Sequence, residues 1–177
     1  MSGAGRPRAV VGVSGSPGSL AALHRAVREA RRTGAEVLAV LAWEPPGGEL
    51  AHGRSPLALP LADLRRDAGE RLLAAVDAAF GDAGPGVPLQ ALVVRGTAGR
   101  ALVETADRSD DLLVIGAGPR GTLRGLFPSV TRYCVAHAGC PVLTVPPSPL
   151  EGELAALHRR IALRRAVDAR ELTDGGR

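Results

Sequence analysis

The stretch that decides the fold is residues 112–145, LLVIGAGPRGTLRGLFPSVTRYCVAHAGCPVLTV. An apolar run at 112–116 is followed by a glycine-rich loop, an expected helix at about 129–138, and a second apolar run at 141–145. Many α/β proteins hold a phosphate on backbone N–H groups at the helix start of such a strand–loop–helix–strand unit. The stretch therefore predicts a parallel sheet and a candidate phosphate-binding loop.

Two prolines stand where this loop would offer N–H groups to a phosphate. Pro119 lies in the loop, and Pro128 precedes Ser129 at the expected helix start, where such loops favour glycine. Proline has no backbone N–H to donate. Each lost charge-assisted bond costs about 1.5–3 kcal/mol, so two losses weaken binding roughly 100-fold. The pattern indicates a nucleotide site with some of its donors missing.

The composition indicates one α/β domain with an aliphatic core. The chain has 177 residues, of which 45% are hydrophobic and only 2% aromatic, so the length suits a single domain. A core of Ala, Val and Leu is typical of a parallel sheet covered by helices.

All 22 basic residues are arginines, which excludes a Walker lysine and a Schiff-base lysine. The net charge of +4 and the pI near 10.3 favour nucleic acid as a partner. However, the arginines alternate with 18 acidic residues and stacking aromatics are nearly absent. Nucleic-acid binding is therefore not expected.

The two cysteines, Cys134 and Cys140, are expected to be reduced thiols in a cytosolic protein. No Cys/His spacing typical of zinc occurs, so we expect no metal site. The segment MSGAGRPR lacks the apolar core of a secretory leader, and no apolar run is long enough for a membrane span.

Strand and helix patterns alternate along the chain, which calls for right-handed crossovers in a parallel sheet. Ser19 is expected to cap the first helix, and residues 43–60, rich in proline and glycine, are expected to be loop. The expected strands are residues 8–14, 36–42, 89–94, 112–116 and 141–145, and the expected helices are residues 20–33, 61–80, 97–108 and 129–138.

Residues 8–146 form the expected domain, preceded by the N-terminal segment 1–7 and followed by residues 147–177. That last segment begins as the linker PPSP and continues as an arginine-rich amphipathic helix. We expect the helix to pack on its own domain or on a partner subunit; a membrane-surface or nucleic-acid arm is the alternative. Its apolar face consists of Leu150, Leu154, Leu157, Ile161 and Val167.

Four blocks, in this order, resemble the universal stress protein family over about residues 8–146. They are VVGVSGSPGSLAALHRAVREA, EVLAVLAWEPP, VVRGTAGRALVETADRSDDLLVIGAGPRG and SVTRYCVAHAGCPVLTVP. The resemblance implies a Rossmann-like domain with a five-stranded parallel sheet and helices on both faces. It also implies a homodimer formed partly through the last strand, a cytoplasmic location and a role in the stress response.

Some members of this family bind ATP through a loop of Gly, two residues, Gly, nine residues, Gly and then Ser or Thr. In this chain Gly116 and Ser129 match the two ends of that loop, whereas Pro119 and Pro128 replace the other glycines and the loop is one residue short. Family members that bind nucleotide usually carry an acidic residue at the position of Ser14, whose hydroxyl can still form hydrogen bonds.

By this resemblance the candidate nucleotide site consists of Val13, Ser14, Ala42, Gly116, Gly118, Arg120, Gly121, Ser129, Val130 and Thr131. No catalytic residue is assigned, because no histidine lies in a recognisable motif with a serine or cysteine. The expected function is that of a non-enzymatic, dimeric stress-response or signalling protein with a degraded nucleotide loop. The alternative is a member that retains ATP binding with magnesium; the cofactor is thus either none or ATP.

Overall fold

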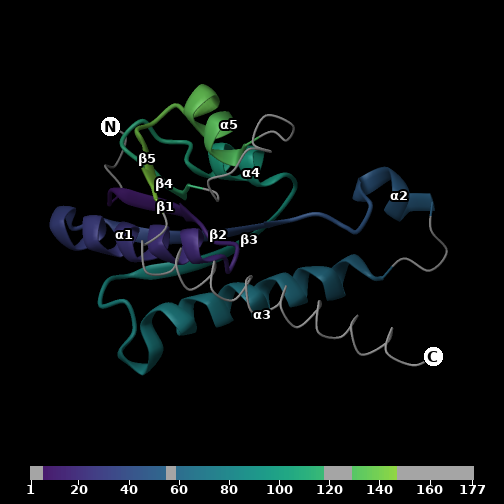
Figure 1. Ribbon diagram of the computed structural model, residues 1–177, viewed down its shortest axis with the longest axis horizontal. Helices are drawn as coiled ribbons and strands as arrows, with labels where there is room; N and C mark the ends of the chain where they lie inside the picture. Colours follow the sequence, from purple (N-terminus) through teal and green to yellow (C-terminus); the bar gives the residue numbers. More distant parts are fainter. Residues whose placement is uncertain (1–5, 55–58, 118–128, 147–177) are drawn as a thin grey trace, which may run out of the picture.

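The computed structural model describes residues 6–54, 59–117 and 129–146 of the chain (Figure 1). Within these residues, five parallel strands form one sheet in the order β3-β2-β1-β4-β5. The predicted fold class is confirmed; the expected C-terminal helix lies outside the described residues. The strands are β1 Arg8–Gly12, β2 Glu36–Trp43, β3 Leu89–Arg95, β4 Leu112–Gly116 and β5 Val142–Val145.

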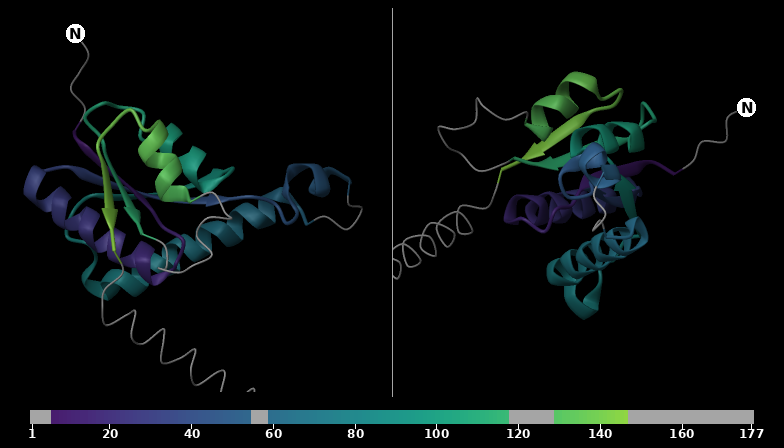
Figure 2. Two further views of the ribbon diagram at one scale, coloured as in Figure 1. Left: turned by 45° about the horizontal axis from the view of Figure 1, so that its top comes forward. Right: turned by 90° about the vertical axis from the view of Figure 1, so that its right-hand side faces the viewer.

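Helices cover both faces of the sheet. In Figures 1 and 2, α1 and α3 lie against one face, and α4 and α5 lie against the other. The short helix α2 lies away from the sheet (Figure 1). The helices are α1 Pro17–Thr33, α2 Gly48–Arg54, α3 Leu61–Phe80, α4 Ala98–Thr105 and α5 Val130–His137, with a 3-10 turn, η1, at Gly81–Ala83.

The core is aliphatic, as the composition predicts, and it is divided in two by the sheet. Successive side chains of a strand point to opposite faces. Val11 of β1 and Val114 of β4 accordingly pack toward α1 and α3, in the larger cluster. Val10 and Leu113 pack with Leu102 of α4 in the smaller cluster on the other face.

Two expectations about local structure are wrong. The first helix begins at Pro17, with Ser16 rather than Ser19 as its N-cap: the Ser16 side chain accepts from the backbone N–H of Ser19. Proline suits the first helical turn, where its missing N–H costs nothing. The segment 43–60 is not entirely loop, because it contains α2, Gly48–Arg54, in a stretch without proline.

Several boundaries also differ from the sequence-based ranges. The first strand ends at Gly12, two residues before Ser14, and the helix expected at 97–108 ends at Thr105. The helix at 61–80 and the strand at 112–116 have the predicted bounds. Among the described residues, no helix is long and apolar enough to span a membrane.

A buried ion pair joins β1 to β4 at the amino ends of the strands. The Arg8 guanidinium donates to both carboxylate oxygens of Asp111, from Nε to Oδ1 at 2.9 Å and from Nη2 to Oδ2 at 2.6 Å. The Asp111 side chain has no exposed area, and it also accepts from the backbone N–H of Arg108 at 3.1 Å. The pair lies beside the start of the β1–β4 pairing, where Ala9 is opposite Leu112.

Candidate functional site

The strand order places a topological switch point between β1 and β4. From β1 the chain proceeds to β2 on one side, whereas β4 pairs with β1 on the other side. In open α/β sheets, ligands bind in the crevice beyond the carboxyl ends of the strands at such a point. Among the described site residues, Val13 and Ser14 follow β1, Gly116 ends β4, and residues 129–131 lie at the start of α5, so they belong to this end of the sheet.

The turn between β1 and α1 is held by three serines. The backbone N–H of Ser14 donates to Ser19 Oγ at 3.2 Å, and the Ser19 hydroxyl donates to the Ser16 carbonyl at 2.8 Å. Ser14 Oγ lies 3.0 Å from Ser16 Oγ, and Ser14 itself is exposed. Val13, which precedes it, is buried, and its N–H donates to the Val40 carbonyl at 2.8 Å. Ser14 and Ser16 are thus the exposed serines of this turn, whereas Ser19 is buried.

The carboxyl end of β4 lies in close contact with the start of α1. A Cβ at Gly116 would overlap the Gly18 carbonyl oxygen and lie 2.9 Å from the backbone nitrogen of Ser19. Only glycine therefore fits at 116, whether or not a phosphate binds there. The next N–H, that of Ala117, donates to the Val145 carbonyl at 2.7 Å. The Ala117 N–H thus continues the pairing of β4 with β5, so it is already used in a hydrogen bond within the protein.

The start of α5 offers donors to a ligand. Ser129 is the N-cap, and its Oγ accepts from the Arg132 backbone N–H at 3.4 Å, which leaves its hydroxyl hydrogen to donate elsewhere. Ser129 and Val130 are exposed, and Thr131 is half-buried. The N–H groups of the first helical turn have no acceptor within the helix, and the helix dipole favours an anion beside them.

Ala42 lies near the carboxyl end of β2 and is half-buried, opposite Val94 of β3. Its neighbour Trp43 is 8% exposed and packs into the cluster of α1 and α3. Since side chains alternate along a strand, Ala42 faces the opposite side of the sheet from Trp43. The predicted residues Gly118, Arg120 and Gly121, with Pro119 and Pro128, lie outside the described residues.

The two described histidines with side-chain contacts, His24 and His137, pair with aromatic rings and a backbone carbonyl rather than with a serine or cysteine. His24 makes an edge contact with Phe80, and His137 stacks on Tyr133 and lies 2.8 Å from that residue's carbonyl oxygen. The thiols are poor nucleophiles too, because burial raises the pKa of Cys134 to about 11. In this part of the chain no group of three His, Cys, Asp or Glu is placed to hold a metal ion.

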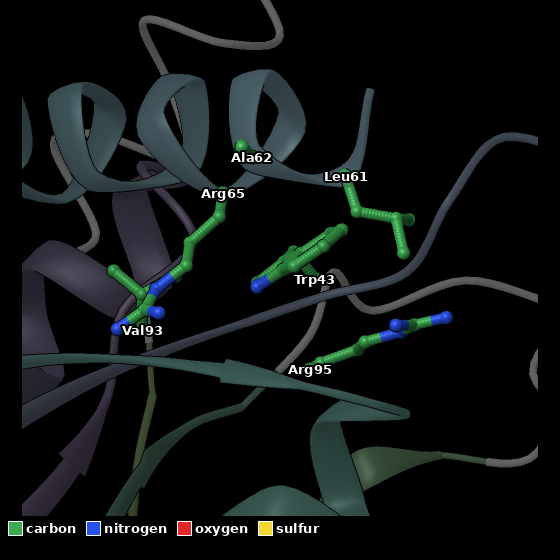
Figure 3. Close-up of a pocket in the computed structure, with 6 residues that line it drawn as sticks. All are labelled: Trp43, Leu61, Ala62, Arg65, Val93 and Arg95. Carbon is green, nitrogen blue, oxygen red and sulfur yellow. The ribbon is translucent and has the colours of Figure 1, made fainter. Parts of the chain in front are cut away.

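Sequence reasoning missed one pocket, which lies on the face of the sheet that α1 and α3 cover. It has a volume of about 400 Å³ and lies between the first turn of α3 and the carboxyl ends of β2 and β3 (Figure 3). The only available signal was the chain's single tryptophan in an otherwise aliphatic sequence. The lining residues are Trp43, Leu61, Ala62, Arg65, Val93 and Arg95.

Known proteins of one family are similar to this chain in sequence. Residues 5–146 match the model of the Universal stress protein family. Two relatives, the universal stress proteins Mb2028c of Mycobacterium bovis and Rv2005c of Mycobacterium tuberculosis, are each 34% identical over 135 residues. Those matches cover 73% of this chain and 41% of each relative, so the chain spans about two fifths of their length.

Solved structures have the same fold. The crystal structure of a universal stress protein in complex with cAMP is 28% identical, with a TM-score of 0.53, and covers 81% of this chain and 98% of that one. A universal stress protein family member from Burkholderia pseudomallei is 24% identical, with a TM-score of 0.56 and coverages of 82% and 99%. By its sequence match and its fold, this chain belongs to the universal stress protein family.

Proposed function

We propose that this chain is a non-enzymatic, cytoplasmic universal stress protein whose switch-point site binds an adenine nucleotide with one phosphate group in preference to ATP. The observation that carries the proposal is the small number of phosphate donors that the described residues offer at the carboxyl end of β4. The Ala117 N–H already donates to Val145, and Gly116 is packed against Gly18. Pro119 and Pro128 have no N–H at all.

The donors among the described residues suit a single phosphate group. The first turn of α5 supplies the Ser129 hydroxyl and the backbone N–H groups of Val130 and Thr131. A helix N-terminus of this kind attracts one anionic group and loses its effect beyond the first turn. A triphosphate needs several further donors and an oxygen-rich site for its magnesium ion. Ser14 offers a hydroxyl there where related sites carry a carboxylate.

The similar structure that contains cAMP supports the same ligand class, since cAMP carries one phosphate group. The second candidate, a protein that retains tight ATP binding, rests on Arg120 and Arg124, which would replace the lost N–H donors with charge.

The test is isothermal titration of the purified full-length protein with cAMP, with AMP, and with ATP and magnesium. We expect cAMP and AMP to bind about tenfold or more tightly than ATP, because one missing charge-assisted bond corresponds to about that factor. Adenosine, which lacks a phosphate, is the control and should bind more weakly than AMP. ATP bound more tightly than both monophosphates would contradict the proposal and favour the second candidate.

We also propose that the protein forms a homodimer through β5. This strand is at one edge of the sheet, opposite the β3 edge, and an edge strand carries unpaired N–H and C=O groups. Two copies of one edge can meet around a two-fold axis. Members of the family commonly form dimers, and a protein partner at residues 147–177 is the further expectation from sequence.

The dimer predicts different results for charges placed at the two edges. Val142→Glu on β5 should shift the protein from dimer to monomer at tens of micromolar, measured by light scattering. Leu92→Glu on β3, at a side chain that is 39% exposed, is the matched control and should leave the mass unchanged. A wild-type protein that is monomeric at these concentrations, or an equal effect of both substitutions, would exclude β5 as the interface.

A further inference from the structure

We propose that the groove between α1 and the end of α3 is a docking site for residues 150–157 of this same chain, a segment that lies outside the described residues. The groove has a volume of about 280 Å³. Four of its lining residues belong to α1, and the fifth is the last residue of α3. They are His24, Val27, Arg28, Arg31 and Phe80.

The floor of the groove is apolar and is held in place by the core. Val27 is only 3% exposed and belongs to the larger core cluster, and Phe80 is half-buried against the same cluster. The His24 ring makes an edge contact with the Phe80 ring, with 5.0 Å between the ring centroids. A leucine side chain placed in the groove would cover apolar surface that the core leaves open.

The rim of the groove is basic. Arg28 and Arg31 are exposed, and the lining includes no acidic side chain. Arg31 donates to the Pro85 carbonyl at 2.7 Å, so Arg28 is the rim cation on which the proposal rests. Glu29, the only acidic residue of α1, is already paired with two other arginines of the helix, at 2.8 Å and 2.7 Å. The groove therefore fits a segment that carries both apolar and acidic side chains.

Residues 150–157, LEGELAAL, have this composition. Glu151 and Glu153 lie among three leucines, and the six arginines of the C-terminal segment all follow, from Arg159 onward. A short isolated helix is marginally stable in water, so these leucines need a surface to pack against. The acidic, apolar part of the segment is thus the part that directly follows the domain.

The chain leaves β5 beside α1. Val145, the last residue of β5, packs against the same core cluster as Leu20 near the start of α1. The linker PPSP, between Val145 and Leu150, spans about 12 Å when extended. Arg28 lies eight residues beyond Leu20, which is also about 12 Å along a helix. The Ser-Pro step of the linker favours a turn, which the segment needs in order to run back along α1.

Attachment to the same chain favours this occupant over a separate acidic protein. A segment on a short linker has an effective concentration on the order of millimolar at its site. Ion pairs at an exposed rim are individually weak, so a free peptide of the same composition would bind poorly. The groove residues come from the later part of α1 and the end of α3, not from the carboxyl ends of the strands. Neither this proposal nor the nucleotide proposal therefore depends on the other.

Limited proteolysis of the full-length protein measures whether residues 150–157 are docked. Thermolysin cuts beside leucine, and mass spectrometry locates each cut. Cleavage of a segment that opens and closes rapidly follows the population of the open form. We expect Arg28→Glu to accelerate cutting within residues 150–157 about threefold or more, the factor that one exposed ion pair supplies. Arg71→Glu is the matched control and should leave the rate unchanged, because Arg71 is exposed on α3 and does not line the groove.

Replacement of the acidic partners should give the same result. Glu151→Gln together with Glu153→Gln should accelerate cutting to a similar extent. Adding Arg28→Glu to this pair should give little further increase, because the interaction is already broken. Thermal unfolding checks that all these variants are folded.

Cross-linking identifies which copy of the chain supplies the segment. The variant His24→Cys, Glu153→Cys is treated with a short bismaleimide and separated on a denaturing gel. We expect a cross-linked product with the mass of one chain, and little of it in the control variant Arg71→Cys, Glu153→Cys. The native Cys134 does not interfere, because it is buried in the smaller cluster on the other face of the sheet.

Equal cutting of the wild type and Arg28→Glu would overturn the proposal, and so would an equal acceleration by Arg71→Glu. A cross-linked product with twice the mass of the chain, without the single-chain product, would place the segment on a second copy and would also overturn it.

Discussion

Asp111→Ala is expected to lower the free energy of unfolding by about 3–5 kcal/mol, the usual cost of removing one partner from a buried ion pair. The substitution leaves the Arg8 guanidinium, whose side chain is only 13% exposed, without its main acceptor. It also leaves the backbone N–H of Arg108 without the carboxylate oxygen at 3.1 Å. The hydrogen bond to Asp111 is the main reason that the pKa of Arg8 is raised. The guanidinium nevertheless stays charged in the variant, because arginine is not deprotonated in proteins at ordinary pH.

Asp107→Ala is the matched control, because Asp107 binds the same guanidinium at 2.6 Å but its side chain is 67% exposed. Solvent screens an exposed pair, so this variant should unfold close to the wild-type midpoint in urea. The double replacement Arg8→Met with Asp111→Leu should recover most of the loss, because apolar residues of similar volume often substitute for a buried pair. Equal unfolding midpoints for Asp111→Ala and Asp107→Ala would show that the buried pair does not hold β1 to β4.

Gly116→Ala is expected to destabilise the protein by about 3 kcal/mol, at the upper end of the usual range for overpacking. The added Cβ would meet backbone atoms of Gly18 and Ser19, which cannot turn aside as a flexible side chain can. The end of β4 and the start of α1 would have to separate, and the turn that holds Ser14 would move with them. Urea unfolding measures the loss.

Gly139→Ala provides the comparison, since a Cβ there would meet nothing within 4 Å and the backbone needs no positive φ. This variant should be as stable as the wild type or slightly more stable, because alanine restricts the unfolded chain. If the two glycine variants lose the same stability, close packing at Gly116 is not the reason for glycine at that position.

The parallel sheet could be predicted from the sequence because the patterns that indicate its strands are strong and local. The apolar runs at Leu112–Gly116 and Glu36–Trp43 are bounded by turns and separated by helical patterns, and this alternation has few topological solutions. A dimer formed through the last strand requires that strand to lie at an edge of the sheet, and the strand order places β5 at an edge.

The remaining features depend on contacts between distant parts of the chain. Arg8 and Asp111 are 103 residues apart, and nothing in a single sequence pairs them. The pocket joins Trp43, Arg65 and Arg95 from three different elements, so no local motif marks it. The choice of Ser16 over Ser19 as helix cap is a local error: Pro17 and Gly18 read as a turn, although proline also begins helices well.

The sequence predicted where the candidate site residues lie, but not which of their polar groups are already hydrogen-bonded within the protein. The resemblance predicted Ser14, Gly116 and Ser129 as site residues, and the element order places all three at the carboxyl end of the sheet. It gave no sign that the Ala117 N–H donates to Val145 or that Ser14 lies 3.0 Å from Ser16 Oγ. These bonds depend on side-chain and strand placement that only the folded chain fixes.

The central claim is that the two prolines limit phosphate binding, and it is tested by titrating ATP with magnesium into the wild type and into the double variant Pro119→Gly, Pro128→Gly. We expect weak or undetectable binding by the wild type and a gain of about tenfold or more in the variant, since two N–H donors return. The gain should be partial, because the loop remains one residue short and Ser14 has no carboxylate; the two added glycines should cost stability of about 1 kcal/mol each. Low-micromolar ATP binding by the wild type, or no gain in the double variant, would contradict the account.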